Sequence, residues 1–285
     1  MPASKPLRLA LCQIAPCFGD IDENTRRIAQ LTRELTADLL VLPELALTGY
    51  DVRDRVHELG ISADELPERF SLPQSSAVAT GFIERADNGI TYNASAIVQE
   101  RAVVALHRKI HLPTYGMFDE GRYFGRGDRV VCGLFAGWRF GVLICEDFWH
   151  PSLTYLLSCQ QMDVLLVQAA APGRGAWTGD RLQPFASTAI WERLARTTAQ
   201  LYGIYVVLCN RVGVEGGVTF AGGSLVVDPS GQVLTAAPGY QEAVLDAILD
   251  PEELYRAQRP YMHSRDEEPQ FVVRELQRIL AAHAG

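Results

Sequence analysis

Hydrophobic and polar residues along the first part of the chain predict a strand, a helix and a second strand. Residues 7–14 alternate as a strand does and lead into a turn rich in proline and glycine. Asp20 or Asp22 can cap the helix that follows. Its apolar residues recur at helical spacing and are Ile28, Leu31 and Leu35. Residues 38–42 form a continuous apolar run, which is typical of a strand buried on both faces. This β-α-β order predicts an α/β fold.

The rest of the chain repeats these patterns. Residues 51–75 have no clean period and are expected to form a surface loop with irregular helix. A helix is expected from about residue 180 to 202, with a buried face of Phe185, Ala189, Leu194 and Leu201. Further strands are expected at residues 94–98, 103–107, 130–135, 139–144, 164–168, 205–209, 223–227, 232–235 and 243–247. These elements predict sheets covered by helices.

No composition break or low-complexity linker divides the sequence, so residues 1–285 are expected to form a single domain. A C-terminal tail is expected from about residue 259. Its apolar residues stand at helical spacing and are Phe271, Val272, Leu276, Ile279 and Leu280. We expect this tail to pack either on its own subunit or on a neighbouring one.

Composition and charge narrow the classes of partner. The chain is 48% hydrophobic and carries 26 Lys and Arg against 34 Asp and Glu, a formal charge of −8. Such a field repels phosphate backbones and anionic lipid, so neither nucleic acid nor a membrane is expected as a partner. The first residues lack the pattern of an export signal, and the longest apolar runs are strand-sized. These features predict a soluble, cytoplasmic protein.

The cysteines indicate thiols rather than disulfides or a metal site. The six cysteines are irregularly spaced in a chain large enough to fold without covalent staples. No CxxC or HExxH pattern occurs. We therefore expect free thiols and no structural metal.

Three polar residues directly follow apolar strand patterns, where the functional side chains of α/β folds gather. Glu44 follows a buried run and would be partly desolvated, which suits a general base, although a surface or capping glutamate fits the pattern too. Lys109 leaves a strand beside a proline-bounded loop, where it could meet developing negative charge or simply be solvated. Cys145 ends an apolar strand and precedes two acids, which suits a nucleophile at a strand-to-helix turn or a buried, inert cysteine.

These three sites together resemble one family. PELALTGY around Glu44, HRKIHLP around Lys109 and GVLICEDFWHP around Cys145 resemble the Glu-Lys-Cys signature of the nitrilase, or carbon-nitrogen hydrolase, superfamily. Residues 210–213 and 220–231 match its N-x-x-G and F-x-G-x-S-x-x-x-x-P-x-G patterns. The resemblance covers about residues 7–250. It implies a four-layer αββα sandwich, usually paired into a homodimer through helices.

The resemblance also implies a cofactor-free hydrolase acting on a small-molecule amide. Glu44 would take the proton of Cys145, whose thiolate would attack an amide or nitrile carbon to form a thioester. Lys109 and the backbone N–H of Glu146 would stabilise the oxyanion. Glu120, in FDEGRYF, fits the family's second glutamate and would hold Lys109 or the substrate amide; a structural salt bridge is the alternative.

The nearest branch is the glutaminase domain of glutamine-dependent NAD synthetases, which the blocks YGMFDEGRYF and CEDFW most resemble. Tyr115 then becomes a candidate to face the substrate, with core packing as the alternative. Trp149 is a further candidate for substrate binding. Residues 169–175 lack the serine usual in those domains, and Arg174 is a hypothetical carboxylate ligand there. No Ser-Gly-Gly-x-Asp-Ser phosphate loop occurs in the 285 residues, so no synthetase half is expected within them.

Three other interpretations remain open. The chain could be a stand-alone glutaminase that passes ammonia to a separate synthetase, or a binding or scaffold member without catalysis. A histidine-assisted cysteine hydrolase is a third and weaker one, because His150 lies five residues from Cys145 but His107 and His111 have no recognisable triad spacing.

Overall fold

The computed structural model describes residues 3–70, 72, 76–175, 185–259 and 266–283. It contains two six-stranded sheets and a short hairpin. The first sheet has the order β14-β1-β2-β3-β4-β5, formed by β1 (Leu7–Gln13), β2 (Leu39–Val41), β3 (Ala77–Arg85), β4 (Thr91–Gln99), β5 (Ala102–Arg108) and β14 (Ala243–Leu249). The second has the order β13-β12-β9-β8-β7-β6, formed by β6 (Cys132–Phe135), β7 (Trp138–Ile144), β8 (Val164–Ala169), β9 (Tyr205–Asn210), β12 (Leu225–Val227) and β13 (Val233–Ala236).

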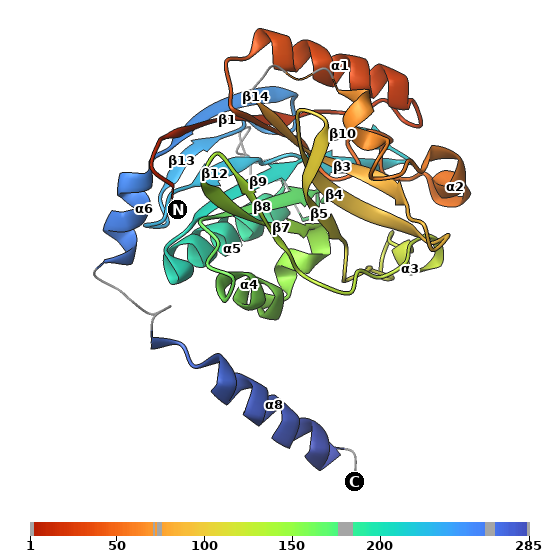
Figure 1. Ribbon diagram of the computed structural model, residues 1–285. Coiled ribbons are helices and arrows are strands. Elements are labelled where there is room, and N and C mark those ends of the chain that lie inside the picture. The colour runs from red at the N-terminus through yellow and green to blue at the C-terminus, as the bar shows by residue number, and fades with distance from the viewer. Residues whose placement is uncertain (1–2, 71, 73–75, 176–184, 260–265, 284–285) are drawn as a thin grey trace.

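Helices cover the outer faces of both sheets (Figure 1). The helices are α1 (Ile21–Glu34), α2 (Val56–Leu59), α3 (Glu120–Tyr123), α4 (Pro151–Ser158), α5 (Ala186–Tyr202), α6 (Pro251–Gln258) and α8 (Pro269–His283). Helix α1 packs on the first sheet, whereas α4 and α5 pack on the second. The result is the predicted four-layer αββα sandwich.

The alternation along each central strand explains this layering. In β8, Val164 and Leu166 point into the core between the two sheets, while Leu165 and Val167 point to the helices. Strand β2 is divided in the same way between the inter-sheet core and the α1 side. Because both faces are buried, these strands are continuous apolar runs, as expected for the parallel pairs β1-β2-β3 and β7-β8-β9.

Several expected elements differ in the structure. Strand β3 and the hairpin of β10 (Val212–Glu215) and β11 (Val218–Ala221) were not expected, nor was helix α6. Helix α5 begins at Ala186, and residues 180–184 lie outside the described residues. Its buried side chains are Thr188, Trp191, Ala195, Thr198 and Ala199. The expectation for Leu201 was wrong, because its side chain is 57% exposed near the end of the helix.

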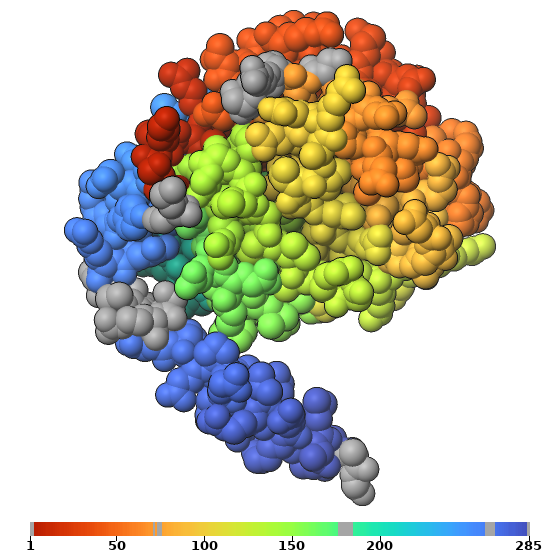
Figure 2. Space-filling view, in the orientation of Figure 1, coloured from red at the N-terminus to blue at the C-terminus, as the bar shows by residue number. Residues whose placement is uncertain are grey.

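The C-terminal helix α8 extends away from the two-sheet body (Figure 1), and Figure 2 shows the same protrusion in space-filling form. Its helical spacing was predicted, yet none of its residues is buried. The exposed apolar side chains include Phe271, Leu276 and Leu280. Packing on a neighbouring subunit therefore stays a prediction. Among the described helices, none combines the length and the apolar character needed to cross a membrane.

Candidate active site

Glu44, Lys109 and Cys145 each follow the end of a strand, and these ends lie where the two sheets face each other. Glu44 comes after β2 and Lys109 after β5 in the first sheet, whereas Cys145 follows β7 in the second. Glu44 and Lys109 have no exposed surface, and Cys145 is 7% exposed. The surface and solvated alternatives for Glu44 and Lys109 were therefore wrong.

A buried lysine joins two carboxylates. The Nζ atom of Lys109 lies 2.7 Å from Oε1 of Glu44 and 2.7 Å from Oε1 of Glu120. Burial alone would lower the pKa of Lys109, but the carboxylates of Glu120 and Glu44 outweigh it and raise that pKa well above its ordinary value. Lys109 is therefore a cation at neutral pH. Glu44, Lys109 and Glu120 are called the buried cluster below.

Both oxygens of Glu44 are held in place. Oε1 accepts a hydrogen bond from Nδ2 of Asn93 at 2.7 Å, in addition to that from Lys109. Oε2 accepts the backbone N–H of Ala170, just after β8, at 2.7 Å. Donors from β4, the end of β5 and the end of β8 thus fix one carboxylate. This arrangement preorganises an acceptor at the sheet ends.

Gly81 in β3 makes room for the loop that carries Glu44. A Cβ atom at Gly81 would lie 2.3 Å from the backbone nitrogen of Leu45 and 2.7 Å from the carbonyl oxygen of Pro43. Both contacts are to backbone, which cannot rotate away as a flexible side chain can. Only glycine therefore permits this close approach between β3 and the Glu44 loop.

Cys145 lies at a strained turn. It is the first residue of a 3-10 helix, Cys145–Trp149, and has a φ of 47°, in the left-handed region that non-glycine residues rarely adopt. Burial raises the pKa of the Cys145 thiol well above its ordinary value, and the Glu44 carboxylate adds to the rise; Lys109 and the Ala170 amide oppose it. The resting thiol is therefore protonated and needs a base to become a nucleophile.

Glu120 is the first residue of the short helix α3, and opposing influences act on the pKa of its carboxyl group. Burial raises the pKa of Glu120 to about 7, against the lowering influence of Lys109 and of the Tyr50 phenol. The hydroxyl of Tyr50 donates to Oε1 of Glu120, the oxygen that also faces Lys109. Oε2 of Glu120 has no hydrogen-bond partner among the described residues. This oxygen is thus available to accept a hydrogen bond from another group.

Asp147 links the Cys145 turn to the strand end that carries Lys109, a role not predicted from the sequence. It is fully buried and accepts hydrogen bonds from Nε2 of His107 at 2.9 Å and from the backbone N–H of His111 at 2.8 Å. Burial alone would raise the pKa of Asp147, but the hydrogen bonds from both histidines hold it well below its ordinary value. The pair of acids after Cys145 was the available signal, but their partners lie far back in the chain.

The predicted substrate-binding residues form a more exposed group. The phenol of Tyr115 donates to Oε2 of Glu146 at 2.7 Å. The guanidinium of Arg174 lies 5.5 Å from the centre of the Phe118 ring, and the Tyr115 ring meets the same ring edge-on at 5.6 Å. Tyr115 is 52% exposed, so the core-packing alternative for it was wrong. Tyr115, Glu146 and Arg174 are called the entrance group below.

Trp149, the remaining predicted substrate-binding residue, contacts another tryptophan. Its ring is 42% exposed and meets Trp191 of α5 edge-on at 5.2 Å. A role for Trp149 in substrate binding stays a prediction.

The histidines near Cys145 are engaged elsewhere. His107 and His111 contact Asp147, and the His150 ring stacks on that of His111 with 3.4 Å between ring centres. Within the described part of the chain, no hydrogen bond joins a histidine to Cys145. This geometry does not favour the histidine-assisted interpretation. All six cysteines are free.

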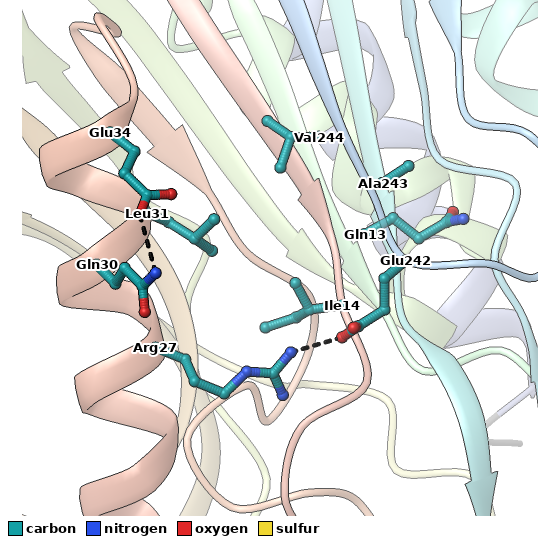
Figure 3. A pocket seen from close by; sticks show the side chains of 9 residues that line it. All are labelled: Gln13, Ile14, Arg27, Gln30, Leu31, Glu34, Glu242, Ala243 and Val244. Atoms are coloured by element: carbon teal, nitrogen blue, oxygen red, sulfur yellow. Dashed lines mark hydrogen bonds and ion pairs between the residues drawn. The ribbon is translucent and has the colours of Figure 1, made fainter.

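A groove on another part of the molecule shares no residue with this site. It lies between α1 and β14, has a volume of about 370 Å³ and is bridged by an ion pair of 2.7 Å between Arg27 and Glu242 (Figure 3). Gln30 and Glu34, two further polar residues of its lining, form a hydrogen bond with each other. Among the described residues, no group of three or more His, Cys, Asp or Glu side chains is arranged to hold a metal ion.

Comparison with known proteins identifies the family that this sequence matches. The family model described as "Carbon-nitrogen hydrolase" matches residues 8–259. Over 254 residues, the chain is 29% identical to the glutamine-dependent NAD(+) synthetase of Acinetobacter baylyi, a match that covers 87% of this chain and 45% of that protein. The chain thus spans less than half the length of this relative.

Two further relatives match over most of both chains. An (R)-stereoselective amidase from a Pseudomonas species is 32% identical over 270 residues, which is 91% of each protein. The crystal structure of a carbon-nitrogen hydrolase from Helicobacter pylori G27 superposes with a TM-score of 0.82 at 24% identity, covering 93% of this chain and 96% of that one. The second likeness concerns the fold alone.

Proposed function

The chain belongs to the carbon-nitrogen hydrolase family, and from that premise we propose that it hydrolyses a small carboxamide through a thioester on Cys145. The observation that carries this proposal is the buried cluster itself. Glu44 is fixed by three donors, one of them the buried Lys109, and both charged groups influence the pKa of a protonated thiol at a strained turn. A merely structural salt bridge would not need the thiol or the strain.

In the proposed reaction, Glu44 takes the proton of Cys145 as sulfur attacks the amide carbon. The carbonyl oxygen becomes an oxyanion, stabilised by the Lys109 ammonium and the backbone N–H of Glu146; each such donor is typically worth about 3 kcal/mol. The C–N bond then breaks, and Glu44 gives its proton to the departing ammonia or amine. Water, deprotonated by Glu44, attacks the thioester and releases the carboxylic acid, and the proton returns to Cys145.

Glu120 is proposed to keep Lys109 in position and to meet the substrate amide. One oxygen faces Lys109, and the other has no partner among the described residues. A substrate N–H would satisfy that second oxygen. Because the pKa of Glu120 is raised to about 7, activity that depends on its ionised form should rise with pH across neutrality.

The entrance group favours a substrate that has charged groups at a distance from the amide to be cleaved. Arg174 provides an exposed cation, and the side chain of Glu146 provides a carboxylate. A carboxylate on the substrate would pair with Arg174, and an ammonium group would pair with Glu146. Glutamine or another ω-amide of an amino acid has both charges, and it is the substrate class we favour.

A second candidate function is a stand-alone glutaminase that delivers ammonia to a separate synthetase. The match to part of a glutamine-dependent NAD(+) synthetase favours it, while the amidase relative of matching length favours independent hydrolysis. A binding member without catalysis is a third candidate. Ammonia release from glutamine alone, and its change when a purified synthetase is added, would separate the first two.

The test is ammonia release from a panel of amides, nitriles and ureido acids by wild type and by Cys145→Ala. We expect turnover of at least one ω-amide by wild type and none by the variant. Cys145→Ser, which keeps a hydroxyl of similar size, is the matched control for folding. If no compound is turned over and Cys145 resists alkylation, the non-catalytic candidate replaces this proposal.

A further inference from the structure

The hairpin formed by β10 and β11 lies against the loop that follows Glu44. Its turn is made by Gly216 and Gly217, whose φ values are 58° and 80°. At the end of β10, Oε1 of Glu215 accepts the backbone N–H of Tyr50 at 2.7 Å and that of Asp51 at 2.5 Å. A side chain distant in sequence thus fixes two consecutive backbone amides beside the buried cluster.

Two glycines allow the hairpin and the loop to pack closely. A Cβ atom at Gly49 would lie 2.7 Å from Oε2 of Glu215, and one at Gly216 would lie 2.4 Å from Oδ2 of Asp51. Both glycines also have positive φ. Both contacted atoms belong to side chains, so a Cβ atom at either glycine would displace the Glu215 or the Asp51 carboxylate.

Glu215 is itself held by a buried arginine. Nη1 of Arg211 lies 2.8 Å from Oε2 of Glu215, and the two side chains are 2% and 6% exposed. The Arg211 guanidinium also stacks on the ring of Phe220 at 4.2 Å. A buried ion pair of this kind is often no more stabilising than a well-packed apolar pair. Its effect here is to fix the position of the Glu215 carboxylate.

Tyr50 connects the Arg211–Glu215 ion pair to the buried cluster. Its ring meets Phe220 at 5.9 Å and Phe118 at 6.1 Å, both edge-on, which fixes the direction of the phenol. The phenol donates to Oε1 of Glu120, the same oxygen that faces Lys109. A movement of the backbone at residues 50 and 51 would therefore move the donor off Glu120.

We propose that Glu215, fixed by Arg211, is a positioning residue that holds the Tyr50 phenol on Glu120 and so keeps Glu120 on Lys109. This inference rests on the proposed amide hydrolysis, to which it adds a residue remote from the reacting atoms. The phenol stabilises the ionised form of Glu120, because its hydrogen bond is made to the carboxylate. Loss of the contact between Glu215 and the backbone at residues 50 and 51 should therefore raise the pKa of Glu120.

The direct test is the titration of Glu120, followed by NMR in protein labelled with ¹³C at the glutamate carboxyl carbon and assigned with Glu120→Gln. We expect Tyr50→Phe to raise the midpoint by about one pH unit, the size of one hydrogen bond to a charged group. Glu215→Ala should raise it in the same direction. Glu215→Ala in the Tyr50→Phe background should add nothing, since both changes remove one interaction.

Two controls protect this test. Glu215→Gln keeps an oxygen that can accept the two backbone amides, so its midpoint should shift less than that of Glu215→Ala. If Glu215→Ala fails to fold because Arg211 is left unpaired, Arg211→Met with Glu215→Leu removes the acceptor without leaving a buried charge. That double variant should show the same rise as Glu215→Ala.

An unchanged midpoint in the Glu215 variants, or a shift that adds fully to that of Tyr50→Phe, would overturn the positioning role. The acid limb of kcat/KM gives a second readout and should move to higher pH with the Glu120 midpoint. If wild type turns over no amide, the proposed hydrolysis fails, yet the NMR titration still decides whether Glu215 controls Glu120.

Discussion

The buried cluster and Tyr115 of the entrance group both interact electrostatically with the Cys145 thiol, but the two groups are built in opposite ways. Glu44 and Lys109 are fully buried, and Glu44 accepts three hydrogen bonds from donors within the chain. Tyr115 is 52% exposed, and among the described residues its phenol donates a hydrogen bond to Glu146. The first arrangement fixes geometry before a substrate arrives, and the second has contacts that a substrate can replace.

This difference predicts different kinetic roles for the two groups. Groups that stabilise charge developing in the transition state must be preorganised, so damage to the buried cluster should lower kcat. Groups that recognise remote parts of a substrate contribute binding in the ground state as well, so damage to the entrance group should raise KM. Four substitutions, from the largest expected effect to the smallest, test this division.

Glu44→Gln should have the largest effect, because it removes the base while keeping the shape. We expect kcat to fall about 10³-fold with little change in KM, measured by steady-state ammonia release. Glu84→Gln is the matched control, since Glu84 is also buried and paired, with Arg108 at 2.6 Å, but lies outside the cluster. Equal losses of kcat in both variants would contradict a catalytic role for Glu44.

Gly81→Ala should come next, because the added Cβ would push the Glu44 loop away from β3. We expect kcat to fall about 10²-fold, as small displacements of positioned groups commonly do, with a loss of about 1–3 kcal/mol in the free energy of unfolding. Gly60→Ala is the control, because its nearest contact would be 3.1 Å. A fully active Gly81→Ala protein would show that Glu44 tolerates displacement.

Asp147→Asn should lower stability more than activity. We expect about 3 kcal/mol less free energy of unfolding at pH 7, from urea melts, and about a tenfold lower kcat. The folded-state pKa of Asp147 is lowered from the ordinary 3.8, so its contribution is complete above that value and is lost as pH falls through the folded value. The difference from wild type should therefore narrow below about pH 4.

The control for this variant is Asp246→Asn on an exposed position of β14, which should leave unfolding unchanged. A wild-type advantage that stayed constant down to pH 3 would show that the charge of Asp147 is not the stabilising feature.

Arg174→Ala should have the smallest effect, because the side chain is exposed. We expect KM for an amide that carries a carboxylate to rise about fivefold with kcat unchanged, the effect of one exposed ion pair. A neutral amide should show no change in either constant. Equal KM values for wild type and variant with the acidic amide would remove Arg174 from substrate recognition.

The same contrast explains how much of the site could be predicted from the sequence. Glu44, Lys109 and Cys145 follow strands, so position made them candidates beside structural alternatives, and the family resemblance selected them and added Glu120. Asp147 and Glu215 could not be assigned roles in this way. Their partners come from distant segments, such as His107 for Asp147 and Tyr50 for Glu215, and only the folded chain brings them together.

The fold was predictable where the hydrophobic period was clean. Strands buried on both faces, such as β8 and β9, read as continuous apolar runs and were placed within one residue. Strand β3 was missed, because Thr80 and Gly81 interrupt its apolar pattern. The β10–β11 hairpin was missed although Gly216 and Gly217 give a two-residue turn signal that could have found it.

The most direct test of the central claim is to look for the thioester. Wild-type protein quenched in acid during amide turnover should show, by intact mass spectrometry, an added acyl group that maps to the peptide containing Cys145. Hydroxylamine should remove it, and Cys145→Ala should not acquire it. Turnover that persists in Cys145→Ala without any adduct would contradict the claim that the buried cluster serves a cysteine nucleophile.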